Sequence, residues 1–345
     1  MKKLFTLFNL CVVLTTLLIL TSCRKYHNGP SNPGSVSTTW TKNTSLPVGE
    51  KFNVLETSGN TVYAASGSGI VYSSSDLGST WSASAVVKQG TMISALAVFN
   101  SSIYVGTYAD GIFASSDGGR TWAHQSANTQ VTSFTVWNNN LYLSSSAGTS
   151  PADGVMVLNQ SAGTWSAFNS NGLPSNYDFT TVKLVVANQT LVSVRGVNGF
   201  FYSFDNNSGQ WNSKDYFAPH RLIVMQDVVS DQGVLLVSSG KLLLNSTNGG
   251  ATWSVDTLGL AQEPDLITFT PKTRILYSIN GNCYVVSNMP TGGAFIQKRN
   301  ITSPAGNTWA TQSEFLQIPG LTYDIRALNN VLFLATDDGL YYKQI

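Results

Sequence analysis

Three octapeptides place a carboxylate or an amide between hydroxyl side chains, a pattern that could serve either chemistry or architecture. They read SSDLGSTW (74–81), SSDGGRTW (115–122) and STNGGATW (246–253). An Asp in such a segment could act as a general acid or base. It could instead accept hydrogen bonds from nearby backbone N–H groups and hold a turn closed. Which role applies depends on where the three copies lie in the fold.

Other residue types that could support catalysis are few and scattered. The three histidines, His27, His124 and His220, form no metal-binding motif such as HExxH. Two of the three cysteines precede residue 24, and the remaining Cys283, in the apolar context GNCYVV, is predicted to be a buried strand residue. The sequence contains no phosphate-binding or dinucleotide-binding motif. We therefore expect neither a metal nor a cofactor.

The composition favours a globular domain and argues against nucleic-acid binding. Hydrophobic residues make up 42% of the 345 positions, which is enough for a sizeable core, and charged residues only 11%. Without Lys2 and Lys3, 17 of the 19 basic residues remain, against 18 acidic residues. A nucleic-acid partner would require a basic surface that such a balance does not supply.

The first 23 residues have the order of a secretory signal. Lys2 and Lys3 precede an apolar run over 4–20, which ends in Leu-Thr-Ser-Cys at residues 20–23. The run is short for a transmembrane anchor and contains Asn9. Its ending resembles a bacterial lipobox, which implies cleavage before Cys23 and a lipid on its thiol.

Three regions follow from this interpretation. Residues 1–22 are predicted to be a lipoprotein signal peptide and 23–37, rich in Pro, Gly and Ser, a lipidated flexible tether. Residues 38–345 form the folded domain. We expect the chain to be anchored in the bacterial cell envelope, with the outer membrane as the favoured membrane and its side left open.

The tryptophans reveal an internal repeat. Six of them are spaced by 41 to 46 residues, and Phe295 stands at the next expected site; the six are Trp40, Trp81, Trp122, Trp165, Trp211 and Trp253. A period near 42 residues is typical of a four-stranded propeller blade.

The sequence between the tryptophans indicates four short strands in each repeat. In residues 92–123, three alternating runs are separated by turns, and the octapeptide leads to a fourth run beginning at Thr121 and Trp122. The same pattern recurs at 52–75, 131–146, 179–196, 222–246 and 266–287.

The last repeat is incomplete at one end of the chain and completed at the other. Residues 323–345 supply three strands, whereas 35–43 contain a Trp with no strand before it. A blade built from both termini would close the ring and remove its open edges. The sequence therefore predicts an all-β, seven-bladed β-propeller with four-stranded antiparallel blades.

The octapeptide resembles the Asp-box, or BNR repeat, of sialidase-type propellers. That resemblance implies a turn between the third and fourth strands, on the face opposite the ligand site, with the indole packed between blades. It assigns a structural role to nine residues: Asp76, Gly78, Trp81, Asp117, Gly119, Trp122, Asn248, Gly250 and Trp253.

Sialidase activity itself is not expected. The family's Phe/Tyr-Arg-Ile-Pro strand corresponds here to residues 51–55, KFNVL, which contain no Arg and no Pro. The resemblance would require an arginine triad, and Arg195, Arg221 and Arg326 could be drawn into one, but no motif supports that set.

A ligand is expected on the face made by two sets of loops. By analogy with other propellers, these are the segments leading into the innermost strands and the loops joining second to third strands. The longest such loop is 144–154. Aromatic and charged residues in these loops could hold a sugar or a peptide, or could be ordinary solvated loop residues. The candidate ligand-binding residues are Tyr108, Asp110, Tyr177, Asp178, Arg195, Arg221, Asp265, Tyr323, Asp324 and Asp337.

These features predict a non-catalytic, envelope-anchored binding module that recognises a protein or a glycan. The chain resembles BNR-repeat lipoproteins and propellers of the photosystem-assembly-factor type, whose family role is to bind a protein partner. One alternative is a glycoside hydrolase with paired carboxylates, drawn from Asp178, Asp265 and Asp324. Another is a purely structural envelope component.

Overall fold

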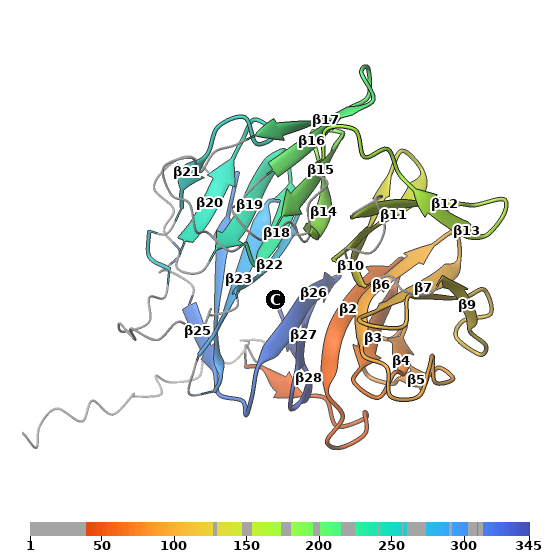
Figure 1. Cartoon of the computed structure of the whole chain (residues 1–345). Coiled ribbons are helices and arrows are strands. Elements are labelled where there is room, and N and C mark those ends of the chain that lie inside the picture. The colour runs from red at the N-terminus through yellow and green to blue at the C-terminus, as the bar shows by residue number, and fades with distance from the viewer. Residues whose placement is uncertain are drawn as a thin grey trace, which may run out of the picture. The chain divides into compact units, whose positions relative to one another are not determined.

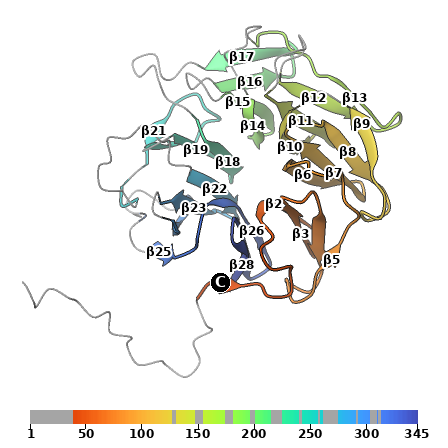
Figure 2. The same ribbon diagram turned by 60° about the horizontal axis from the view of Figure 1, so that its bottom comes forward.

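The computed structural model consists of seven four-stranded antiparallel sheets arranged in a ring (Figures 1 and 2). The structure describes residues 39–126, 130–146, 154–173, 181–195, 201–214, 225–239, 242–256, 258–260, 274–289, 292–302, 309 and 313–345. The predicted signal peptide, tether and lipidated Cys23 lie outside these residues. The all-β, seven-bladed prediction is confirmed.

Each blade runs from an innermost strand at the axis to an outer strand at the rim. The first three blades are β2 (Phe52–Ser58), β3 (Thr61–Ser66), β4 (Val71–Ser74) and β5 (Ser82–Ala83); β6 (Ile93–Phe99), β7 (Ser102–Thr107), β8 (Ile112–Ser115) and β9 (Ala123–Ser126); and β10 (Val131–Trp137), β11 (Asn140–Ser145), β12 (Val155–Asn159) and β13 (Thr164–Ala167).

The next three blades follow the same order. They are β14 (Thr181–Ala187), β15 (Thr190–Arg195), β16 (Phe201–Asp205) and β17 (Gln210–Lys214); β18 (Asp227–Asp231), β19 (Val234–Ser239), β20 (Leu242–Ser246) and β21 (Ser254–Val255); and β22 (Arg274–Ile279), β23 (Asn282–Asn288), β24 (Ala294–Asn300) and β25 (Ser313–Leu316).

The seventh blade joins the two ends of the folded domain. It consists of β26 (Thr322–Leu328), β27 (Val331–Thr336) and β28 (Gly339–Gln344), with β1 (Thr41–Lys42) as its outer strand. Thr41 pairs with Tyr342, and Lys42 pairs with Tyr341. The Asn43 side-chain amide then donates to the Gly78 carbonyl of the first blade, at 2.7 Å. The predicted closure by both termini is confirmed.

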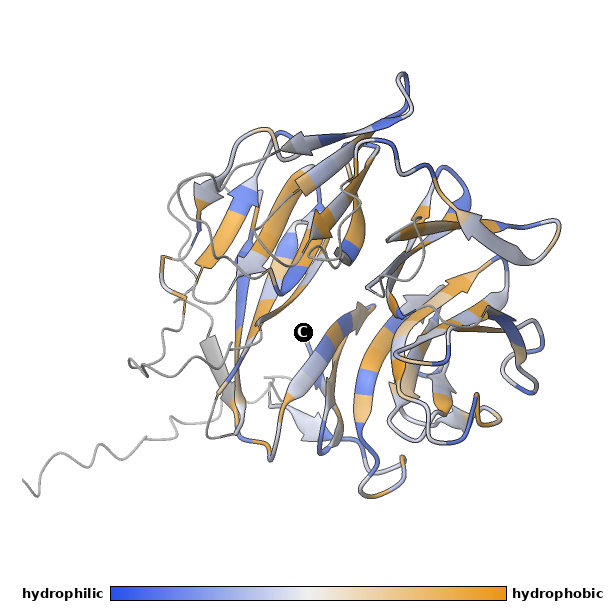
Figure 3. Cartoon of the chain, viewed as in Figure 1, coloured by the Kyte–Doolittle hydropathy of each residue, from blue (hydrophilic) through white to orange (hydrophobic). Residues whose placement is uncertain are grey.

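The hydrophobic core lies between neighbouring blades. In one cluster, Phe52 and Leu55 of the first blade pack with Phe333 of the seventh, and all three are fully buried. Other clusters join the second blade to the third and the fourth to the fifth. Figure 3 shows the hydrophobic residues concentrated along the strands. Because each sheet covers the next, burial of apolar area holds the ring together.

The octapeptides form the turns between third and fourth strands. In the first copy, Asp76 accepts hydrogen bonds from the Thr80 backbone N–H at 2.9 Å and from the Thr80 and Ser74 hydroxyls at 2.6 and 2.7 Å. The Ser74 oxygen in turn accepts the Gly78 N–H at 2.8 Å. The 115–122 copy repeats these four bonds. In the third copy, Asn248 makes the equivalent contacts, with its amide donating to a threonine hydroxyl.

The spacing of Gly and Trp that the three octapeptides share serves packing between blades. Gly78 has a φ of 85°, and a Cβ there would lie 2.7 Å from a ring carbon of Phe333. Trp81 meets Phe333 edge-on, with 6.3 Å between the ring centroids. The ring centroids of Trp253 and of Phe201 in the preceding blade are 4.3 Å apart. The indoles of Trp81 and Trp253 therefore pack between blades. In these three copies, however, the Trp precedes the outer strand instead of starting it.

The sixth blade corrects two details of the predicted repeat. Its innermost strand begins at Arg274, so Asp265 does not directly precede that strand and 274–279 are the first strand of the blade, not the second. Phe295 lies on the third strand and not at an outer-strand position. The aromatic anchor of this region is the fully buried Trp309, whose indole N–H donates to the Asp256 carbonyl at 3.1 Å.

The octapeptide carboxylates should contribute pH-dependent stability. Hydrogen bonds from Thr80 and Ser74 lower the pKa of Asp76 from 3.8 to about 2. The stabilisation is therefore complete above about pH 4, the ordinary carboxylate range, and is lost as the pH falls through the depressed value. Since Asn248 shows that an amide fits this turn, Asp76→Asn should lower the melting temperature less than Asp76→Ala at pH 7.

Thermal unfolding followed by circular dichroism between pH 7 and pH 2 tests this expectation. The gap in melting temperature between the wild type and Asp76→Asn should narrow below pH 4 and close near pH 2. Asn207→Ala, in an exposed turn of the fourth blade, is the control. A gap that stays constant with pH would contradict the assigned role of the Asp76 carboxylate.

Candidate functional site

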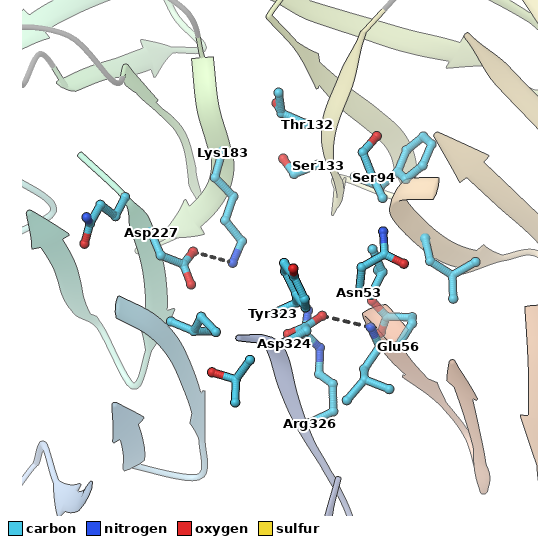
Figure 4. A pocket seen from close by; sticks show the side chains of 18 of the residues that line it. Asn53, Glu56, Ser94, Thr132, Ser133, Lys183, Asp227, Tyr323, Asp324 and Arg326 are labelled. Carbon is cyan, nitrogen blue, oxygen red and sulfur yellow. Dashed lines mark hydrogen bonds and ion pairs between the residues drawn. The ribbon is translucent and has the colours of Figure 1, made fainter. Parts of the chain in front are cut away.

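The seven innermost strands converge on a cavity of about 340 Å³ at the axis of the ring. Every blade contributes at least one lining residue, and most of these residues come from the first half of an innermost strand. Figure 4 shows the polar side chains that face this space. The cavity thus lies toward the end of the ring at which the innermost strands begin.

Two sets of loops meet at that end of the ring, as the sequence predicted. The Gly67 N–H in the β3–β4 loop donates to the Lys51 carbonyl just before β2, at 2.9 Å. Equivalent bonds join Tyr108 to Met92 at 3.1 Å and Asp337 to Leu321 at 2.9 Å. We call this end of the ring the mouth face. It comprises the segments leading into the innermost strands and the loops joining second to third strands.

A bulge opens the start of five innermost strands. The pairing with the second strand shifts by one residue at the same place in β2, β6, β10, β14 and β26. The extra residues include Asn53, Ser94, Thr132 and Tyr323, all of which line the cavity. Because a bulge redirects side chains at a strand end, it turns these polar groups toward the axis.

Polar side chains below the bulges link one blade to the next. An Asp324 carboxylate oxygen accepts the backbone N–H of Leu55 at 2.9 Å, and Asp227 accepts that of Leu276 at 2.8 Å. Ser133 accepts the N–H of Leu184 at 3.1 Å. Each bond satisfies a backbone donor on the edge of an innermost strand, where no further strand can pair.

Charged side chains in the cavity form two ion pairs. Lys183 Nζ lies 2.9 Å from Asp227, and Arg326 pairs with Asp324 (Figure 4). Burial raises the pKa of Asp324 above its ordinary value, and Arg326 and the Leu55 N–H oppose that rise. Burial also raises the pKa of Glu56, which faces the same cavity, with Arg326 acting against it.

The rim of the cavity carries a second polar group. The Tyr323 hydroxyl donates to Asp337 at 3.0 Å, and Lys51 Nζ lies 3.2 Å from the same carboxylate. Burial, with the neighbouring Asp337, raises the pKa of Tyr323 to about 12. The phenol is thus held in its neutral, hydrogen-bonding form. Tyr323 and Asp337 belong to the seventh blade, and two further predicted residues of the mouth face, Tyr108 and Asp110, lie in the β7–β8 loop of the second blade.

Tyr108 and Asp110 differ in availability. The Tyr108 side chain is 57% exposed. Asp110 pairs with Lys88, accepts the Thr91 hydroxyl at 2.6 Å, and its carbonyl meets the His124 ring at 2.9 Å. These bonds lower the pKa of Asp110, with the bond to Lys88 the largest cause. Tyr108 can therefore contact a ligand directly, whereas Asp110 fixes the loop.

The remaining predicted ligand residues have varied positions. Arg195 ends β15, and Asp324 lies inside β26 with its carboxylate already bonded to Leu55 and Arg326. Tyr177, Asp178, Arg221 and Asp265 lie outside the described residues. The sequence patterns did not point to Glu56, Lys183 and Asp227, which line the cavity. The available signal was a charged residue within an apolar innermost strand, as in FNVLETS and TVKLVVA.

Exposed apolar side chains gather on the mouth face over the seventh, first and second blades. Six large hydrophobic residues there are at least 40% exposed: Val48, Val86, Met92, Tyr108, Leu321 and Tyr323. They lie in segments that lead into β2, β6 and β26, in the β7–β8 loop, or at the start of β26. Such clustering is typical of an interaction surface.

Two further observations concern the described residues alone. They include no group of three or more His, Cys, Asp or Glu side chains placed to hold a metal ion. No helix among them has the length and apolarity needed to cross a membrane. Cys283 is fully buried in β23, as predicted, and burial raises the pKa of its thiol well above the ordinary value.

The fold and its axial cavity define a seven-bladed β-propeller domain. A family model described as the DUF6242 beta propeller domain matches residues 15–164. No curated protein shows significant sequence similarity to the chain.

Several solved structures share the fold. The extracellular domain of BT4673, described as a hybrid two-component system of B. thetaiotaomicron, has a TM-score of 0.65 at 12% identity, over 89% of this chain and 40% of that one. YCF48 bound to D1 peptide has a TM-score of 0.62 at 11% identity, over 89% and 96%. YCF48 from Cyanidioschyzon merolae has a TM-score of 0.62 at 13% identity, over 88% and 98%. The chain thus spans less than half of the BT4673 domain, and these similarities concern the fold.

The bond from Asp227 to the next blade should be important for stability. Asp227→Ala leaves the N–H of the fully buried Leu276 without its acceptor, which costs about 1–3 kcal/mol. Asp227→Asn keeps an acceptor oxygen and should cost clearly less. Urea unfolding of both variants gives the comparison, with Ser133→Ala as an uncharged counterpart between the third and fourth blades. Equal losses for Asp227→Ala and Asp227→Asn would assign the effect to the lost charge instead.

Proposed function

We propose that this propeller is a non-catalytic binding module of the bacterial cell envelope that recognises a protein partner through its mouth face. The observation that carries the proposal is the coincidence of two features on that face. The axial cavity lies toward it, and exposed apolar side chains lie on the same face over three adjacent blades. A concave polar centre beside an apolar surface suits a partner that docks and inserts one group.

The chemistry of the exposed residues favours a protein over a glycan. Val48, Val86, Met92 and Leu321 are aliphatic or thioether side chains between 41% and 100% exposed. A sugar presents hydroxyl groups, and it gains most from flat aromatic faces beside hydrogen-bonding groups. Aliphatic side chains instead gain free energy by covering the apolar side chains of a polypeptide. The peptide-bound state of the similar propeller YCF48 is consistent with this use of the fold.

The carboxylates of the cavity support a role without catalysis. Asp227 and Asp324 each pair with a cation and also accept a backbone N–H from the next blade. A hydrolytic carboxylate must instead be free to protonate a leaving group or to attack the substrate. A hydrolase that used Asp324 would have to break the bond from Leu55 that joins the first and seventh blades, whereas Asp178 and Asp265 lie outside the described residues.

The cellular address in this proposal rests on the N-terminal sequence. The apolar run over 4–20 and the following Leu-Thr-Ser-Cys support lipid attachment at Cys23, with 24–37 as a spacer. An extracytoplasmic position is in keeping with the extracellular location stated for the BT4673 domain.

A charge introduced on the mouth face should weaken binding of the partner. Met92 is 50% exposed there, and Val136, 49% exposed near the far end of β10, is a matched control on the opposite face. Site-specific photocrosslinking in envelope fractions should identify the partner. The affinity of the identified protein for Met92→Asp should then be at least about tenfold weaker than its affinity for the wild type. Val136→Asp should bind like the wild type.

A glycan array probed with the same proteins distinguishes the other ligand class. Glycan binding that is lost in Met92→Asp, with no crosslinked protein, would replace the protein partner with a glycan. Equal weakening by Met92→Asp and Val136→Asp would remove the mouth face from the proposal. Glycoside turnover abolished by Asp324→Asn would establish the hydrolase.

A further inference from the structure

We infer that the axial cavity is a binding site for one positively charged group, an ammonium or a guanidinium, and that Glu56 is its counterion. The inference deepens the proposed function, on which it rests, by naming the group that a docked protein partner inserts: a lysine or arginine side chain.

The charges lining the cavity are unequal. Among the described lining residues, Asp227 is balanced by Lys183 and Asp324 is balanced by Arg326. Glu56 is the fifth charged group, and it faces two groups of the other sign that are already paired. With all five groups ionised, the described lining has one negative charge in excess.

The Glu56 carboxylate is also short of hydrogen bonds. The described contacts give it one, from the backbone N–H of Thr57 to Oε1 at 2.9 Å. Asp324, by comparison, accepts the N–H groups of Leu55 and Ile325 and pairs with Arg326. A carboxylate can accept about four hydrogen bonds, so Glu56 retains acceptor capacity directed at the cavity.

Burial of this excess charge is energetically unfavourable without a compensating cation. Desolvation is the largest cause of the raised pKa of Glu56, and it exceeds the opposing effect of Arg326. A ligand cation would neutralise the excess charge and would bring its own N–H donors to the unused oxygen positions. Charge-assisted bonds of this kind are stronger where water is largely excluded.

The surroundings of Glu56 suit a cation carried on an apolar stem. The cavity of about 340 Å³ is larger than an alkylammonium group requires. Hydroxyl and amide side chains of Ser94, Thr132 and Asn53 line its wall and could accept further N–H donors. Apolar lining residues, among them Val54 and Ile275, could cover the methylene groups of the stem. An anionic ligand is less favoured, because the two cations of the described lining, Lys183 and Arg326, are already in ion pairs.

The test uses small probes and the full folded domain. Nα-acetyl-lysine methylamide and its uncharged norleucine analogue are titrated into the protein and followed by NMR and calorimetry. The lysine probe should bind with a Kd of about 1 mM, as expected for one charged contact with little other buried area. The norleucine probe should bind at least about tenfold more weakly, the loss of one charge-assisted contact.

Two variants isolate the role of Glu56. Glu56→Gln should weaken lysine-probe binding about tenfold or more. Glu50→Gln removes the same charge just before the same strand, where Glu50 accepts the Ser68 N–H, and should leave probe binding unchanged. In the wild type, affinity should fall as the pH is lowered through the raised pKa of Glu56, because protonation removes the counterion.

Several outcomes would overturn the inference. These are equal binding of the norleucine probe, unchanged affinity in Glu56→Gln, preference for Nα-acetyl-glutamate methylamide, or no lysine-probe binding at about 20 mM, some twentyfold above the expected Kd. The pH titration of the wild type keeps the inference testable if Glu56→Gln unfolds. Met92→Asp should lose the partner but keep the probe, so failure of the cavity site and failure of the mouth face are separable.

Discussion

The innermost strand of every blade has one edge that no other strand can cover, and the arrangement of the site depends on how that edge is satisfied. Leu55, Leu184 and Leu276 lie on such edges with their side chains almost completely buried. Their backbone N–H groups are paired by side chains of the neighbouring blade: Asp324, Ser133 and Asp227. Closing the ring covers the faces of the sheets, but it leaves the inner edge of each blade at the axis, where side chains must satisfy the backbone N–H groups. The polar residues at the axis are therefore part of the fold before they are part of any site.

This requirement also explains why the axis is charged. An Asp that accepts two N–H groups still needs a cation when it is buried, and Lys183 and Arg326 provide one for each. Glu56 makes no comparable bond between blades among its described contacts. Among the charged residues of the described lining, Glu56 belongs to neither ion pair, and this distinguishes it from Asp227 and Asp324, which join neighbouring blades. A residue that costs stability and holds no blade in place is a natural candidate for binding.

Most of the fold could be predicted because its signals are local. The octapeptide needs Ser, Asp, Gly and Thr at fixed positions for one turn, and the tryptophan that follows marks each blade. In the sixth blade Trp309 lies between the third and fourth strands, as the octapeptide tryptophans do, but it comes 56 residues after Trp253 instead of about 42, so the alignment there moved by one strand. The site was harder to predict. Tyr323 and Asp337 were found from loop positions, but Lys183, Asp227 and Glu56 lie within strands and meet only when the ring is closed.

The closing pair between β1 and β28 has a consequence for the order of folding. Thr41 of β1 pairs with Tyr342 of β28, which lies about 300 residues later in the chain. Six blades can form from local hairpins as the polypeptide emerges, but the seventh cannot be completed until residues 339–344 are available. Bringing such distant segments together carries a loop-closure entropy that is offset only when the full ring packs. We accordingly expect ring closure to be a late step of folding, with the outer edge of β28 uncovered until β1 pairs with it.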